Sequence, residues 1–281
     1  MSPADRVAAA LGSAPVLVRP VPGGDINRAL HLTLADGREV FVKHRDDPPP
    51  GMYPAEAAGL AWLAGAGAIR VPGVLHADDA VLALEWITPG RPGPGHDERL
   101  GLGLAALHRA GAPSFGLGAD GFIGTIPQSN APLPDWPAFY GERRIAPVAR
   151  RAHARGLLDA AAMAGVERLI ARLPDLCGPP EPPARLHGDL WGGNAMADEA
   201  GAPVLVDPAA YGGHREVDLA MMRLFGGFSA AVFAAYAEAH PLAPGHEERV
   251  DLYQLYPLLV HVALFGAGYV PGVERVLGRY A

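Results

Sequence analysis

The sequence predicts an α+β protein of two lobes, with a small antiparallel sheet in the N-terminal lobe and a larger, mainly helical C-terminal lobe. Two patterns indicate this division. Before residue 88 the apolar residues mostly alternate along the chain, which is typical of half-buried strands, and after residue 95 they recur mostly with helical spacing. The Pro/Gly-rich stretch TPGRPGPG at 88–95 separates the two patterns, so we place the lobes at 1–87 and 88–281.

The first predicted element is a β-hairpin over residues 28–43. In RALHLTLA the leucines alternate with polar or small residues, and Asp36-Gly37, a dipeptide favoured in tight hairpins, follows directly. The returning segment REVFVK places its two valines on one face and Phe41 and Lys43 on the other. The hairpin therefore ends at Lys43.

The next elements complete the N-terminal lobe and build the C-terminal one. A helix is predicted over 54–66, with Pro54 in its first turn, and a second hairpin is predicted from VLHA and VLALEW around Asp78-Asp79. Beyond the linker lies a short β-region over 185–207. The helices predicted around it cover 96–110, 135–155, 159–172, 216–226, 229–239 and 246–266.

The bulk composition excludes several functional classes. About half of the 281 residues are hydrophobic (49%) and only 19% are charged, which favours a packed globular protein over a disordered one. A net charge of −7 without a basic block argues against a nucleic-acid partner. The N-terminus lacks the pattern of a signal peptide, and the longest apolar stretch is too short to span a membrane, so we expect no membrane partner. Cys177 is the only cysteine, which favours a cytoplasmic location.

The most informative stretch is RLHGDLWGGN, at 185–194, followed by the apolar run VLVD that ends at Asp207. Asp189 and Asn194 have the D-x-x-x-x-N spacing of the catalytic loop in kinase-type phosphoryl transfer, where the Asp accepts the hydroxyl proton and the Asn holds Mg²⁺. The turn residues DEAG between the loop and the apolar run predict a hairpin that returns Asp207 to the loop as a second Mg²⁺ ligand. A turn Asp, a capping Asn and a strand-end Asp would explain each residue singly but not their spacing.

A zinc site at the same loop is the competing interpretation. His187 and Asp189 are suitable ligands, but no third His or Cys lies near them in the sequence. We therefore interpret His187 as a structural residue that holds the loop by hydrogen bonds.

Lys43 is the only lysine among 23 basic residues, the others being arginine. A compact ammonium is required where a guanidinium does not fit, and kinase-type sites place a lysine at the end of such a strand, on the nucleotide phosphates. Its usual partner is a glutamate on the following helix, and Glu56 is the available one. The alternatives are a chance lysine and a solvated acid in the first helical turn.

Two further segments are suited to the nucleotide. Gly23 and Gly24 stand between two strands, where backbone amides without side chains can approach phosphates closely; a plain hairpin turn is the alternative. LALEWITPG, at the exit from the N-terminal lobe, would offer backbone groups from Glu85 to Ile87 to the edge of an adenine.

HGDLWGGN, with Trp191 two residues after the acid, resembles the catalytic loop of the fructosamine kinase (ketosamine kinase) family. RVPGVLHAD, DWPAFYGERRIAP, DPAAYGGHREVDLAMMRLFGGF and DLYQLYPLLVHVALFGAGY are also similar to segments of this family, so the likeness covers nearly the whole chain. The resemblance implies a protein-kinase-like fold related to aminoglycoside and choline kinases. It also implies phosphorylation of a ketosamine at its 3-hydroxyl, with ATP and Mg²⁺ as cofactors.

The substrate residues are predicted less directly. Trp191 can stack on the apolar face of a sugar, although a core tryptophan that anchors the loop is the alternative. Glu216 and Asp218 are candidates for recognising the substrate amine by neighbourhood, and Asp218 also matches an acid that braces the loop in the family. Asp25 stands where some relatives have Ser or Cys, and we expect its side chain to point away from the phosphates.

The expected partner is a ketosamine, either as a small molecule or on a glycated protein, and the expected assembly is a monomer or a weak homodimer. A kinase of another small molecule, such as an aminoglycoside or an amino-alcohol, is the nearest alternative. A non-catalytic ATP-binding pseudokinase is the alternative from a different class.

Overall fold

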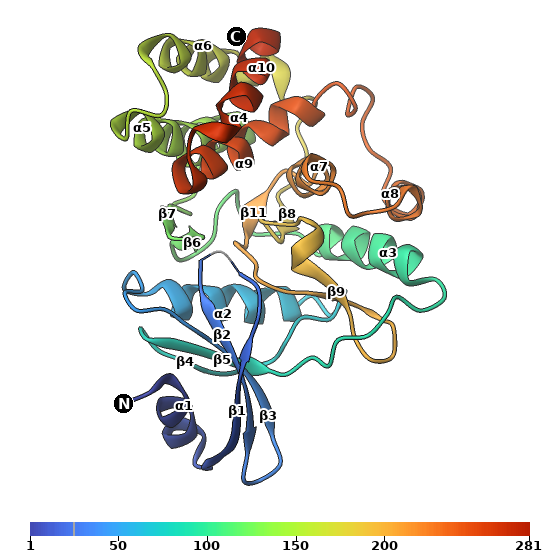
Figure 1. Cartoon of the computed structure of the whole chain (residues 1–281). Helices are drawn as coiled ribbons and strands as arrows, with labels where there is room; N and C mark the ends of the chain where they lie inside the picture. The colour runs from blue at the N-terminus through green and yellow to red at the C-terminus, as the bar shows by residue number, and fades with distance from the viewer. Residues whose placement is uncertain (25) are drawn as a thin grey trace.

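The structure is a computed structural model that describes residues 1–24 and 26–281. A five-stranded antiparallel sheet forms the N-terminal lobe, seen in the lower half of Figure 1. Its strands follow the order β1-β2-β3-β5-β4 and are, in chain order, β1 (Pro15–Val21), β2 (Arg28–Leu34), β3 (Glu39–His44), β4 (Val74–Ala77) and β5 (Val81–Glu85). Both predicted hairpins are confirmed, because β2 pairs with β3 and β4 pairs with β5.

The two faces of this sheet have different roles. Val40 and Val42 of β3 pack with Val7 of helix α1 (Pro3–Leu11), which covers one face. Phe41 points to the other face, which packs on α2 (Met52–Ala64). Since side chains alternate along a strand, Lys43 points to the same face as Phe41, as the sequence predicted.

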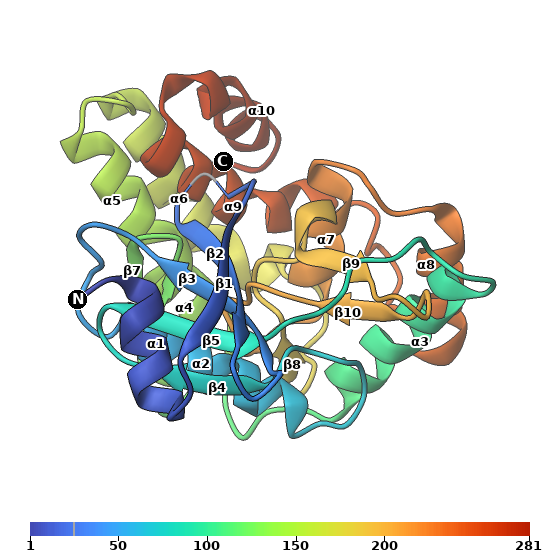
Figure 2. The same ribbon diagram turned by 60° about the horizontal axis from the view of Figure 1, so that its bottom comes forward.

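The C-terminal lobe is mainly helical and fills the upper half of Figure 1. Its longer helices are α3 (His96–Arg109), α5 (Ala146–Ala154), α6 (Ala160–Leu176), α7 (Glu216–Leu224), α8 (Ala230–Ala239), α9 (Val250–Phe265) and α10 (Val270–Tyr280). In both views α8 lies beside α3 at one side of the lobe, and α5, α6 and α10 lie at the other (Figure 2). The α+β, two-lobed architecture is therefore confirmed.

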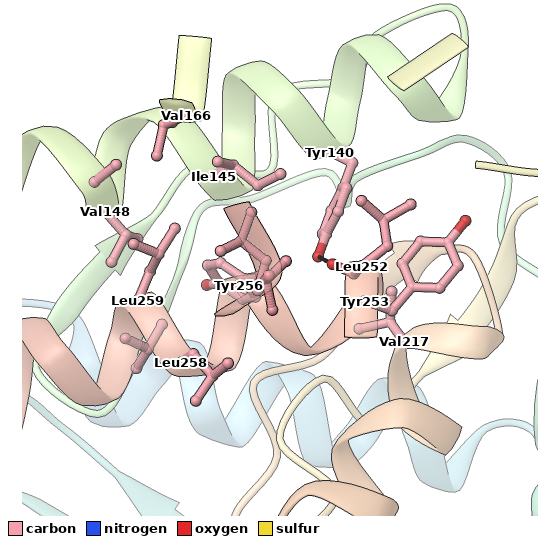
Figure 3. Packing of buried hydrophobic residues seen from close by; sticks show 14 of the residues in the cluster. Tyr140, Ile145, Val148, Val166, Val217, Leu252, Tyr253, Tyr256, Leu258 and Leu259 are labelled. Carbon is pink, nitrogen blue, oxygen red and sulfur yellow. Dashed lines mark hydrogen bonds between the residues drawn. The ribbon is translucent and has the colours of Figure 1, made fainter. Parts of the chain in front are cut away.

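Helix α9 forms the centre of the C-terminal core. Its residues from Leu252 to Val260 are all buried, which is expected for a helix that is apolar on every side. Tyr140, Tyr253 and Tyr256 place aromatic rings in this core, and the hydroxyl of Tyr140 donates a hydrogen bond to the carbonyl of Leu252 at 3.0 Å (Figure 3). The core thus fixes the position of α9, whose C-terminal part lines the cavity described below.

Short strand pairs connect the helices to the sheet lobe. Strands β9 (Ala195–Ala197) and β10 (Pro203–Leu205) pair antiparallel around the DEAG turn, so the hairpin predicted to return Asp207 is confirmed. Strands β8 (Ala184–Leu186) and β11 (Tyr211–Gly213) pair beside them, and β6 (Gly121–Ile123) pairs with β7 (Ile126–Gln128).

The helix predicted over 135–155 is interrupted in the structure. It consists of α4 (Trp136–Phe139), a π-helical segment (Tyr140–Ile145) and α5. Pro147, at the start of α5, has no N–H to continue the regular hydrogen-bond pattern, and the side chain of Arg144 donates to the carbonyl of Arg143 at 3.1 Å instead.

Other helices differ from the sequence-based prediction at their ends. The helix predicted from 246 begins at Val250, after a series of turns. Helices α1 and α10 were not predicted, although Ser2 caps α1 by accepting from the N–H of Asp5 at 3.1 Å. Within the described ranges no helix has both the length and the apolar character needed to cross a membrane.

Candidate active site

A cavity of about 910 Å³ opens between the sheet lobe and the helical lobe. Ten of the twelve residues predicted for the site line it, and two do not. The ten are Gly23, Gly24, Lys43, Glu56, Glu85, Ile87, Asp189, Trp191, Asn194 and Asp207. The chain therefore gathers residues from positions 23 to 207 around one cavity.

Lys43 lies between two carboxylates. Its Nζ is 2.6 Å from Oε1 of Glu56 on α2 and 2.7 Å from Oδ1 of Asp207, and only 5% of the lysine is exposed. Burial alone would lower the pKa of Lys43, but the charges of Asp207 and Glu56 outweigh it and raise the pKa well above its usual value. The ammonium therefore stays charged at neutral pH, as binding to phosphates requires.

The catalytic loop holds Asp189 and Asn194 together. The amide nitrogen of Asn194 donates to the backbone carbonyl of Asp189 at 2.7 Å and to its Oδ2 at 3.2 Å. Burial raises the pKa of Asp189 to about 7, and the nearby charge of Asp207 adds to this effect. A carboxyl with a pKa near neutrality is well suited to exchange a proton with a substrate hydroxyl.

Asp207 is held in a strained backbone conformation. Its φ of 57° is the only positive φ at a non-glycine position in the ranges 1–24 and 26–281. Such a conformation costs free energy and is kept where the surroundings fix it, often at functional sites. The conformation places the carboxylate against Lys43, where it is partly exposed to the cavity.

Asp218 braces the loop from behind and does not line the cavity. It is fully buried, and its two oxygens accept from the backbone N–H of His187 at 2.8 Å and of Gly188 at 2.9 Å. His108 of α3 adds a third contact at 3.2 Å. The prediction that Asp218 contacts the substrate is therefore corrected, because the side chain is buried behind the loop and outside the cavity lining.

Glu216 is also displaced from the predicted substrate role. It is 4% exposed and forms a bidentate ion pair with Arg249, with N···O distances of 2.6 and 2.9 Å. Among the acids predicted for the site in the C-terminal lobe, only Asp189 and Asp207 line the cavity. The prediction that Glu216 recognises the substrate amine is therefore corrected as well. The side chain points into the lobe because a buried arginine neutralises it there.

His187 holds the loop as the sequence suggested. The imidazole is buried, with Nε2 2.9 Å from the carbonyl of Val206 and Nδ1 accepting from the N–H of Asp189 at 3.3 Å. Burial lowers the pKa of His187, which keeps the ring neutral. The ring thus links the catalytic loop to the segment that ends at Asp207.

The residues predicted to face the nucleotide lie on the sheet side of the cavity. Gly23 and Gly24 have φ values of 108° and 83°, which favour glycine and keep side chains away from an approaching phosphate. The side chain of Glu85 is engaged by Arg70 at 2.6 Å, and within residues 1–24 and 26–281 no hydrogen bond is formed by the N–H of Ile87. Asp25 lies outside the described residues.

Trp191 lies across Gly193, a contact that the sequence did not reveal. A Cβ added to Gly193 would be 2.3 Å from the nearest ring atom of Trp191. The indole is 40% exposed and lines the cavity, so Trp191 is not a core residue. Glycine at 193 therefore determines where this ring lies.

Four further aromatic residues that line the cavity were missed. They lie directly after α7, on α9 and in the segment after α9, and they are Phe225, His261, Phe265 and Tyr269. In the sequence they look like ordinary core residues, although the i, i+4 spacing of His261 and Phe265 places both on one face of a helix.

The donor set fits a Mg²⁺ ion that is shared with phosphates. Magnesium prefers oxygen ligands and is often bound by one or two carboxylates together with substrate phosphates. Asp207 offers a carboxylate, and the amide oxygen of Asn194 accepts no hydrogen bond from residues 1–24 or 26–281. In the same ranges no group of three or more His, Cys, Asp or Glu side chains is placed to hold a metal alone. The site therefore suits a metal that arrives with its nucleotide.

Comparison with known proteins places this arrangement in a family. The model of the fructosamine kinase family matches residues 4–281. A "Probable ketoamine kinase" from Lactiplantibacillus plantarum is 37% identical, covering 94% of this chain and 94% of its own. A "Protein-ribulosamine 3-kinase, chloroplastic" from Arabidopsis thaliana is 36% identical, covering 92% of this chain and 81% of its own.

Solved structures support the same placement. A "putative fructosamine-3-kinase" from Thermobifida fusca superposes with a TM-score of 0.90 at 45% identity and covers 99% of both chains. A "Macrolide 2'-phosphotransferase type I" has a TM-score of 0.65 at 16% identity, over 98% of this chain and 95% of its own, and so shares the fold alone.

Proposed function

Because the chain belongs to the fructosamine kinase family, we propose that it transfers the γ-phosphate of ATP to the 3-hydroxyl of a ketosamine. The observation that carries the proposal is the contact of Lys43 with both Glu56 and Asp207, at the cavity that Asp189 and Asn194 also line. This is the residue set that kinase-type phosphoryl transfer uses. The ketoamine and fructosamine kinases to which the chain is similar support the substrate class.

Asp189 acts on the acceptor hydroxyl. As the hydroxyl oxygen forms a bond to the γ-phosphorus, the bond from that phosphorus to the leaving ADP oxygen breaks, and the hydroxyl proton passes to a carboxylate oxygen of Asp189. Asn194 holds this carboxylate by its 3.2 Å hydrogen bond. Positioning and electrostatic stabilisation supply most of the rate, because no covalent intermediate forms.

Lys43 and the glycine loop act on the nucleotide. The Lys43 ammonium offsets negative charge on the phosphates, and Glu56 fixes its direction. Gly23 and Gly24 cover the phosphates with backbone amides, and the backbone from Glu85 to Ile87 borders the adenine. Asn194 and Asp207 would hold Mg²⁺, which supplies charge neutralisation at the transferring phosphate when bound.

The proposal also covers the roles of the two lobes, the cellular location and the contact of Trp191 with the sugar. We divide the chain functionally into a nucleotide lobe at 1–87 and a lobe at 88–281 that carries the catalytic loop and the acceptor. A reaction that consumes ATP suits a cytoplasmic location. Trp191 would stack on the sugar, since its ring is exposed in the cavity near the loop.

The experiment is a panel of acceptors with ATP and Mg²⁺, in which ADP release and the phosphorylated product are both measured. A ribulosamine, a fructosamine, an aminoglycoside and choline are compared at equal concentrations. The proposal expects transfer to a ketosamine, with the phosphate on its 3-oxygen by NMR. Transfer to the aminoglycoside or choline alone, or ATP binding without transfer to any acceptor, would overturn it.

A further inference from the structure

Four aromatic rings form a cluster at the mouth of the cavity, which we call the ring cluster: Phe225, His261, Phe265 and Tyr269. His261 is at its centre, with ring centroids 4.7 Å from Phe225, 4.9 Å from Tyr269 and 5.4 Å from Phe265. All four line the cavity. Phe225 is 42% exposed and Phe265 is 46% exposed, and exposed rings that meet in one patch often mark a binding site.

The ring cluster is attached to the catalytic loop. Gly192 of the loop lies against Gly227, so closely that a Cβ on Gly227 would be 3.1 Å from the Cα of Gly192. Phe225 stands two residues before Gly227, and Trp191 stands one residue before Gly192. The ring cluster therefore borders the part of the cavity that the catalytic loop lines.

The ring cluster itself contains no carboxylate, and most carboxylates of the described lining are already paired. Five carboxylates line the cavity among residues 1–24 and 26–281. Three of them belong to the catalytic set, Glu85 is paired with Arg70, and Asp120 accepts from the N–H of Asn130 at 2.7 Å. An amine beside the ring cluster would therefore meet aromatic rings rather than a carboxylate of the cluster.

Aromatic faces can bind such an amine. The face of a ring is electronegative, and clusters of rings bind ammonium groups by cation–π attraction, most strongly where water is excluded. His261 adds a directed contact: its Nδ1 lies 2.7 Å from the carbonyl of Pro257, so it carries the proton and donates. Burial lowers the pKa of His261, which keeps the ring neutral and leaves Nε2 as an acceptor for an N–H.

The geometry points to the ring cluster as the subsite that binds the protonated amine of the ketosamine, with His261 Nε2 accepting one of its hydrogens. This inference rests on the proposed function and names how that site recognises its substrate class. Phe225 and Phe265 are both exposed, which places the amine at the mouth of the cavity. The group attached to the amine then extends into solvent, so an amine carried on a peptide fits as well as a small one.

The test compares two acceptors that differ only at the amine: an N-alkyl fructosamine, and the corresponding 1-O-alkyl fructose, in which an ether oxygen removes both the positive charge and the N–H donors. The wild-type protein should use the amine with a kcat/KM about tenfold or more above that of the ether. Phe225→Leu and Phe265→Leu keep apolar volume but remove the ring face. Each should raise KM for the amine about 3- to 10-fold and leave KM for the ether within about twofold.

His261→Phe keeps a ring and removes the acceptor nitrogen, so it should also raise KM for the amine selectively. Phe233→Leu is the matched control, because Phe233 lies on α8 outside the cavity lining and packs under Arg223 instead. An unchanged Kd for ATP in each variant shows that it is folded.

Equal use of amine and ether by the wild type would overturn the inference, and so would equal losses on both acceptors in the variants or unchanged KM for the amine. Failure of the proposed function has a different signature. In that case the wild-type protein transfers no phosphate to either acceptor.

Discussion

Replacing Gly193 by alanine should displace Trp191 and weaken acceptor binding without unfolding the protein. The new Cβ would lie 2.3, 2.5 and 2.7 Å from three atoms of the indole. Carbon atoms in contact are about 3.5–4.0 Å apart, so the ring must move by more than about 1 Å. Because Trp191 is 40% exposed, it can swing outward, and we expect the free energy of unfolding to change by less than about 1 kcal/mol.

The effect on catalysis should be much larger than the effect on stability. A displacement of about 1 Å of a positioning group can cost about 100-fold in rate, so kcat/KM for a ketosamine should fall about 10- to 100-fold. The Kd for ATP should stay the same. Steady-state kinetics with the acceptor varied measure this, and Trp191→Ala should give a loss of similar size.

Gly278→Ala is the matched control, since a Cβ on this glycine of α10 would meet no atom within 4 Å. It should leave kcat/KM unchanged. If Gly193→Ala keeps its kcat/KM within about twofold of the wild type, Trp191 does not position the acceptor and the reasoning fails.

Three further predictions follow from buried groups. Asp218→Asn should lower the free energy of unfolding in urea by about 3 kcal/mol, because the amide carries no charge and its NH2 group leaves one of the two loop N–H groups without an acceptor; a loss below about 1 kcal/mol would contradict the brace. Burial lowers the pKa of His214 to about 4. Between about pH 6.5 and 4 the His214 ring therefore binds a proton in the unfolded chain but not in the folded one, and the free energy of unfolding should fall by about 3 kcal/mol as the pH drops through that range. His214→Asn should remove that part of the pH dependence in denaturant titrations, and an identical slope would refute it. Lys43→Arg should lower kcat/KM at least about tenfold, because a planar guanidinium does not fit between two carboxylates at 2.6 and 2.7 Å; full activity would show that the ammonium is not required.

The elements that follow a regular pattern were predictable from the sequence. The hairpin 28–43 alternates along its first strand and carries Asp36-Gly37 at its turn, so both its register and the direction of Lys43 follow from local rules. Helix α1 was missed although it has a serine cap, because it is only nine residues long. Local signals of that kind are weak until the sheet packs against them.

The site was predictable where spacing alone defines the chemistry. Asp189 and Asn194 belong to one loop, and the hairpin after it returns Asp207, so these three are near one another for local reasons. The direction of a helical side chain is different, since it depends on tertiary partners. Glu216 points inward because it forms an ion pair with Arg249, and Asp218 points inward because it accepts hydrogen bonds from the loop N–H groups. Neither partner can be predicted from the sequence near these two acids.

The ring cluster was not predictable for a related reason. Phe225, His261 and Tyr269 come from separate segments, and each is an ordinary apolar position when its own segment is considered alone. Only the assembled structure shows that the rings meet and that two of them stay exposed at a cavity.

The most direct test of the account is phosphate transfer from ATP to a ketosamine by the wild-type protein and by Asp189→Asn, measured side by side with the Kd for ATP. The account predicts that the variant binds ATP within about threefold of the wild type and turns over at least about 100-fold more slowly. A variant that transfers phosphate at nearly the wild-type rate would contradict the central claim that Asp189 receives the proton of the acceptor hydroxyl.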